Sequence, residues 1–183
     1  MEKLKMSYDE IRSKIDLKFN WDNIKTTNCY AYALGLDIPY SEVLEGNYAY
    51  SIGEIGKFSF NMDSDYLYRL PYYYRMLIDM QTLGIKIDEV RESYPSLCDI
   101  DSDGYLSWVV ALYEAKSTIT SDFHLLRKTS DGIWYHKRGT TGAVTNIDDD
   151  KKIITNLDDI YLDWMYDEDP YVRVGVYNLR LKR

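Results

Sequence analysis

The chain has 183 residues, which suits a single domain that can bury a hydrophobic core without disulfides or a structural metal. Its formal net charge of -8 and its pI near 4.8 argue against binding to the nucleic-acid backbone, which requires a positive surface. The sequence has no run of about 18 apolar residues, and residues 1–20 lack the apolar stretch of a secretory signal. These features predict a cytoplasmic protein that does not span a membrane.

The N-terminal third is expected to contain two short helices. Residues 8–19 place apolar side chains at near-helical spacing and predict an amphipathic helix. A second helix is expected over 29–34, because Asn28 can cap its start and Gly35 can end it. Residues 36–63 are rich in Gly and Pro turn signals and predict loops with a short strand near 57–60.

The middle of the chain predicts more helix and then a buried strand. Residues 65–80 carry an apolar stripe at helical spacing, while Pro71 predicts a kink or the start of a second helix. The apolar run within 105–114 is typical of a buried strand.

The remaining segments complete an α+β domain. A strand hairpin is expected around the two histidines, a short helix over 157–165, and an alternating strand over 172–181. Helices followed by a mostly antiparallel sheet define the α+β class. No repeat or linker divides residues 1–183, so a single domain is predicted.

Both histidines of the chain, His124 and His136, flank the turn sequence 129–132. A three-residue turn over 130–132, with Gly132 in the left-handed conformation, would pair Thr129 with Ile133 and place both histidines on one sheet face, one diagonal apart. A two-residue turn would shift the register by one and separate them. A joint site for the two imidazoles requires the first register.

Cys29, His124 and His136 have the residue types of a thiol active site. A cysteine in the first turn of a helix lies near N–H groups and the positive end of the helix dipole, which favour the thiolate. His124 is the candidate base, because imidazole titrates near neutral pH. Either His136 or Asp122 could orient it. Cys29 could instead be a small buried apolar residue.

Other polar residues are candidates for binding groups. The backbone N–H of Cys29 could stabilise an oxyanion, with Asn23 or Asn28 as side-chain donors. Arg127 and Lys137 could bind a substrate carboxylate, although charged residues on hairpin strands more often lie on a solvated sheet face.

Metal sites are the alternative use of these residues. Cys29, His124 and His136 could ligate zinc, but the chain lacks a close-spaced ligand pair. The acidic stretch 99–104 copies the first half of a calcium loop, yet Val110 occupies the position of the bidentate Glu. We therefore expect no metal or cofactor, and two reduced cysteines, Cys29 and Cys98.

Two motifs resemble a known family. Residues 28–34 read NCYAYAL, and residues 122–139 contain DFHLLR, SDGIW and HKRG. These motifs resemble those of a family of mostly uncharacterised bacterial and phage proteins, which is similar in motif order and spacing to the NlpC-type branch of papain-like cysteine hydrolases. The resemblance implies a papain-like α+β fold with Cys29 as nucleophile, His124 as base and His136 as orienting residue.

The long stretch between Cys29 and His124 implies an inserted helical region around 61–95, which could serve as a lid or a partner surface. Two functions are compatible with the sequence. The first is a cysteine hydrolase or acyltransferase that acts on a peptide or protein, reaching a cell-wall substrate only after dedicated secretion or lysis. The second is a non-catalytic, phage- or plasmid-borne inhibitor whose acidic, tyrosine-rich surface binds a basic protein.

Overall fold

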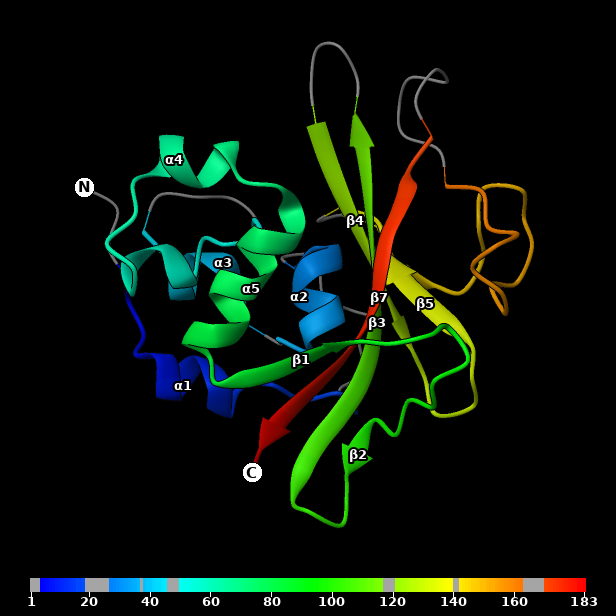
Figure 1. Cartoon of the computed structure of the whole chain (residues 1–183), viewed down its shortest axis with the longest axis horizontal. Coiled ribbons are helices and arrows are strands. Elements are labelled where there is room, and N and C mark those ends of the chain that lie inside the picture. Colours follow the sequence, from blue (N-terminus) through cyan, green and yellow to red (C-terminus); the bar gives the residue numbers. More distant parts are fainter. Residues whose placement is uncertain are drawn as a thin grey trace.

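The computed structural model confirms an α+β domain built on a mostly antiparallel sheet. It describes residues 4–18, 27–36, 38–45, 50–116, 121–139, 142–162 and 170–183. The helices gather on one side of the sheet, and the segment that follows the last short strand lies on the other side (Figure 1).

Within the described residues the sheet has seven strands in the order β1-β7-β3-β4-β5-β6, with β2 paired to β3. All strand pairs among the described residues are antiparallel, and the two longest strands, β3 and β7, are neighbours within the sheet. The strands are β1 (Ile85–Glu89), β2 (Asp99–Ile100), β3 (Tyr105–Lys116), β4 (Ser121–Lys128), β5 (Trp134–Lys137), β6 (Val144–Thr145) and β7 (Val172–Lys182).

The helices of the described residues are short. They are α1 (Tyr8–Ser13), α2 (Cys29–Leu34), α3 (Tyr40–Val43), the 3-10 helix η2 (Gly56–Phe58), α4 (Ser64–Arg69) and α5 (Tyr72–Thr82). The predicted bounds of α2 are confirmed. Asn28 accepts hydrogen bonds from the backbone N–H groups of Tyr30 and Ala31, and Gly35 ends the helix at φ 74°, in the left-handed region.

Alternation along the central strands produces two cores, one on each sheet face. On the first face Val110, Leu112 and Leu125 pack with α2, all of whose residues are buried, and with α5. On the second face Val109, Ala111, Tyr113, Leu126 and Trp134 pack against Ile154, Leu157 and Leu162 of the covering segment. Both faces of β3 are therefore buried, which explains its nearly continuous apolar sequence.

Three predicted elements differ from the structure. The helix expected over 8–19 ends at Ser13, and Ile15 instead forms an isolated bridge with Leu36. The strand expected near 57–60 is the 3-10 helix η2. The helix expected over 157–165 is irregular over 157–162, where apolar side chains serve the second core without helical hydrogen bonds, and residues 163–165 lie outside the described residues.

The region around 61–95 contains a strand as well as helices. Pro71 separates α4 from α5 and stands directly before the first turn of α5, as its missing N–H predicts. The chain then forms β1, which pairs with β7 from Ile85 to Glu89. This region therefore forms an edge of the sheet in addition to covering it (Figure 1).

No helix among the described residues is both long and apolar enough to cross a membrane.

Candidate active site

The hairpin of β4 and β5 has the register that a joint histidine site requires. The N–H of Thr129 donates to the carbonyl of Ile133 at 2.9 Å, and Gly132 has φ +88°. His136 therefore pairs with Leu126, two residues from His124. The three-residue turn is confirmed, and the histidines lie on one face, one diagonal apart.

The two imidazoles are hydrogen-bonded to each other. His124 Nε2 and His136 Nδ1 are 2.8 Å apart, and the rings are nearly perpendicular at 87°. His136 Nε2 lies 3.1 Å from the carbonyl oxygen of Ile147. His136 is thus held between His124 and the segment that follows β6.

The hydrogen bonds determine where the protons lie. A carbonyl oxygen can only accept, so His136 Nε2 carries a proton that it donates to Ile147. A neutral His136 then has a bare Nδ1, which accepts from the N–H at His124 Nε2. His124 consequently keeps its own lone pair at Nδ1, and this nitrogen is the available base.

Burial keeps both rings neutral. The pKa of His124 is well below 6.5 because the ring is buried, with further lowering by His136 and Arg138. Burial also lowers the pKa of His136, although its bond to Ile147 opposes this effect. At neutral pH the pair therefore consists of two uncharged imidazoles.

Cys29 occupies the first turn of α2 but does not have the thiolate character expected there. Its pKa is raised to about 12, chiefly by burial, since only 5% of the residue is exposed. Hydrogen bonds from the backbone at Leu125, Tyr30 and Cys29 itself lower the pKa, but they do not offset the loss of solvent. The resting group is therefore a thiol, and burial outweighs the helix start.

The three predicted residues approach the same part of β4 from its two faces. The thiol of Cys29 bonds the backbone at Leu125, the residue that follows His124. Alternation directs Leu125 toward α2 and both histidines toward the opposite face. Among the described residues, no hydrogen bond joins the Cys29 thiol to His124.

Asp122 has a different partner from the one that the sequence suggested. Its carboxylate accepts a hydrogen bond from the Tyr171 hydroxyl at 2.5 Å, while His136 is the residue that bonds His124. The Tyr171 ring lies 5.6 Å from the His124 ring, centre to centre. Tyr171 therefore borders the histidine pair, and nothing in its local sequence indicated this.

Asn28 and Arg127 are engaged in holding α2. The Asn28 side chain caps α2 with its oxygen and donates from its nitrogen to the carbonyl of Tyr50. Arg127 is buried, donates to the carbonyl of Tyr32 at 3.0 Å and stacks on the ring of Tyr32. Neither side chain faces the histidine pair, and Asn23 lies outside the described residues.

The metal alternatives find no support in the described residues, which contain no group of three His, Cys, Asp or Glu side chains placed to hold an ion. In the acidic stretch, Asp101 accepts from the backbone of Asp103 and Tyr105 and pairs with Arg180 at 3.2 Å. The stretch therefore forms a turn closed by its own hydrogen bonds. Cys29 and Cys98 are free thiols.

Comparison of the chain with protein-family models, with curated proteins and with solved structures gives no match.

Proposed function

We propose that this protein is a papain-like, NlpC-type cysteine hydrolase or acyltransferase that acts on a peptide or another amide through a thioester. The observation that carries the proposal is the 2.8 Å bond between His124 Nε2 and His136 Nδ1. This bond leaves His124 Nδ1 as a base, one residue from the Leu125 backbone that bonds the Cys29 thiol. A nucleophile, a base and a residue that orients the base are the parts that covalent catalysis needs.

In the proposed reaction, the Cys29 sulfur attacks the carbonyl carbon and its proton passes to His124 Nδ1. The new C–S bond pushes the carbonyl electron pair onto oxygen. Collapse of this tetrahedral species breaks the C–N bond, and the amine leaves with the proton returned by His124. Water, or an acceptor amine, then attacks the thioester by the same steps and restores the thiol.

His136 acts by orienting the base. When His124 takes the thiol proton, its Nε2–H donates to the neutral Nδ1 of His136 as a charge-assisted hydrogen bond. Because Cys29 and His124 are both uncharged in the resting site, proton transfer accompanies the attack on the substrate. The Cys29 thiol lies against the Leu125 backbone on the α2 side, whereas alternation directs the His124 ring to the other face of β4. The proposal therefore requires the thiol to move past this backbone to His124 Nδ1 when substrate binds.

Backbone N–H groups are the proposed donors to the oxyanion. The N–H of Cys29 lies at the start of α2, and the Leu125 backbone lies beside the thiol. The Asn28 side chain is excluded from this role because both of its polar atoms have partners.

The proposal is tested by acylation with p-nitrophenyl acetate, followed by intact-protein and peptide mass spectrometry. We expect an acetyl group on Cys29 in the wild type, none at this position in Cys29→Ala, and acylation slowed by about 100-fold or more in His124→Ala. Cys98 is the second free cysteine and serves as the internal reference thiol. Equal acylation of Cys29 in the wild type and in His124→Ala would contradict the proposal.

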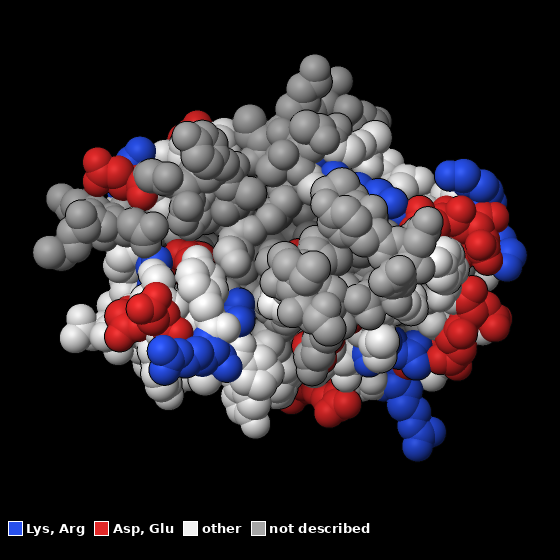
Figure 2. Space-filling model, turned by 90° about the horizontal axis from the view of Figure 1, so that it is seen from above, with Lys and Arg blue, Asp and Glu red and all other residues white. Residues whose placement is uncertain are grey.

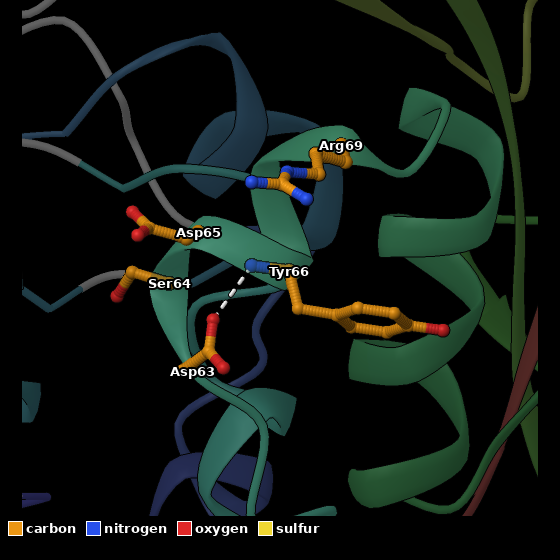
Figure 3. Close-up of a pocket in the computed structure, with 5 residues that line it drawn as sticks. All are labelled: Asp63, Ser64, Asp65, Tyr66 and Arg69. Atoms are coloured by element: carbon orange, nitrogen blue, oxygen red, sulfur yellow. Dashed lines mark hydrogen bonds between the residues drawn. The ribbon is translucent and has the colours of Figure 1, made fainter.

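A second candidate function, binding of a basic protein, is favoured by one observation. Tyr66, Tyr68 and Tyr74 on α4 and α5 are 55%, 46% and 55% exposed, and Tyr is enriched at interfaces. Tyr66 borders a hollow that Asp63, Ser64, Asp65 and Arg69 also line (Figure 3). However, acidic and basic side chains alternate over the described part of the surface seen in Figure 2, and they do not form a single acidic face there.

The two candidates are separated by Cys29→Ala. A binding protein retains its biological effect and its affinity for a basic partner in this variant, whereas an enzyme loses its effect. A stable complex that is insensitive to salt would also count against the electrostatic binding function, because exposed charges are screened.

A further inference from the structure

The side chain of Lys137 is unusual in being a fully buried ammonium group on the last residue of β5. Its Nζ donates to the carbonyl of Gly139 at 3.1 Å, and no carboxylate pairs with it among the described residues. A buried cation is costly unless a negative group stabilises it. A neighbouring group that can become an anion would therefore benefit from Lys137 and would stabilise it in return.

Strand alternation places Lys137 on the sheet face that α2 covers. Trp134 and His136 belong to the opposite face, so Tyr135 and Lys137 point toward α2. Tyr135 pairs with Arg127, which contacts Tyr32 of α2.

The positions along α2 and β5 also correspond. Cys29 lies three residues before Tyr32, about 4.5 Å along the helix, and Lys137 lies two residues from Tyr135, about 6.6 Å along the strand. Leu126 of β4 pairs with His136 of β5. The Cys29 thiol bonds the backbone at Leu125, the neighbour of Leu126 on β4. Lys137 is the neighbour of His136 on β5, at the same end of the pairing. The start of α2 and the end of β5 therefore lie at the same end of the β4–β5 pairing.

We infer that Lys137 is the positive charge that stabilises the Cys29 thiolate whenever it forms. Burial lowers the pKa of Lys137, and its charge interaction with Cys29 opposes this shift, which adds support to the inference. Any role of Lys137 in catalysis rests on the proposed function. In that role Lys137 acts through Cys29, as a positioning residue. It differs from binding of a substrate carboxylate, which requires an exposed cation, and Lys137 is buried.

The test is the rate of Cys29 alkylation by iodoacetamide against pH, with Cys98 as the reference thiol. Lys137→Met removes the charge and keeps a side chain of similar length. At each pH below the titration midpoint of Cys29, we expect Cys29 to react about tenfold more slowly in this variant, which corresponds to a rise of one unit in its pKa. Lys152→Met removes an exposed charge from the segment on the other sheet face and should leave the rate unchanged. An unchanged Cys29 rate in folded Lys137→Met would overturn the inference.

A measurement on the wild type covers the case in which Lys137→Met does not fold. A cation beside a thiol favours an anionic reagent over a neutral one. We expect the ratio of the iodoacetate rate to the iodoacetamide rate to be several-fold higher at Cys29 than at Cys98. An equal or lower ratio at Cys29 would overturn the inference.

The outcomes separate this inference from the proposed function. If Cys29 is acylated at the normal rate in His124→Ala but is alkylated more slowly in Lys137→Met, the proposed function fails and the charge pair stands. If Cys29 is no longer acylated in His124→Ala but is alkylated at the normal rate in Lys137→Met, the charge pair fails and the proposed function stands.

Discussion

At the scale of single residues, the site depends on the protons of two buried imidazoles. The carbonyl of Ile147 fixes the tautomer of His136, and His136 in turn fixes that of His124. The sequence allowed this pair to be predicted, because a twelve-residue separation across a three-residue turn is sufficient to place both rings on one face. It did not allow the pKa of Cys29 to be predicted, since the burial of the thiol depends on how α2 packs on β4.

Replacement of His136 tests the orienting role. In His136→Leu the Nε2–H of His124 loses its acceptor and the ring can turn, so we expect acylation of Cys29 by p-nitrophenyl acetate to fall about 100-fold. His136→Asn retains an acceptor oxygen and should lose less activity. The rates are measured by mass spectrometry at pH 7, with circular dichroism as the control for folding. Equal rates in the two variants would contradict the orienting role.

At the scale of elements, the hairpin turn sets the positions of both histidines. Gly132 holds φ +88°, and a Cβ added there would meet no atom within 4 Å, so a substitution affects the backbone without a clash. The turn was predictable because its conformation is local. The 3-10 helix η2 and the irregular segment 157–162 were not predictable, because their apolar residues follow packing on the sheet faces and do not follow a local period.

The expected cost of changing Gly132 follows from its conformation. Gly132→Val should lower the free energy of unfolding by about 1–2 kcal/mol, because a β-branched residue strongly disfavours positive φ. Gly132→Asn should cost less, since Asn tolerates the left-handed region. Urea denaturation of both variants measures the difference. Equal stability of Gly132→Val and wild type would show that the turn does not adopt this conformation in solution.

At the scale of the whole molecule, a buried carboxylate joins the helical layer together. Asp79 of α5 accepts hydrogen bonds from the Tyr30 hydroxyl at 2.6 Å and from the backbone N–H groups of Gly53 and Gly56 at 2.7 and 2.6 Å. It thereby connects α5 with α2, which carries Cys29, and with the 50–58 segment. The stripe of 65–80 predicted that α5 would pack on the core, but these partners are distant in sequence and could not be predicted from it.

The stability of the protein should depend on the charge of Asp79. The pKa of Asp79 is raised to about 7, chiefly by burial and to a smaller extent by nearby Glu54, while its hydrogen bonds oppose the shift. The folded state therefore binds a proton that the unfolded chain, with a pKa of about 3.9, has already released. Between pH 5 and pH 7 this contribution lowers the free energy of unfolding as pH rises, by about 2 kcal/mol.

Asp79→Asn isolates that contribution, because His124 and His136 titrate alike in the variant and the wild type. Urea denaturation at pH 5 and pH 8 measures the free energy of unfolding of both proteins. Between these two pH values the wild type should lose more of this free energy than Asp79→Asn does. The same pH dependence in both proteins would show that Asp79 titrates in its ordinary range.

The central claim is a neutral histidine pair with the lone pair of His124 at Nδ1, and it is tested most directly by long-range ¹H–¹⁵N NMR of the imidazole rings. The chain has only two histidines, so His136→Asn assigns both sets of signals. We predict that both rings carry their proton at Nε2 and are neutral at pH 7. A proton at Nδ1 of His124, or a charged His124 at pH 7, would contradict the account.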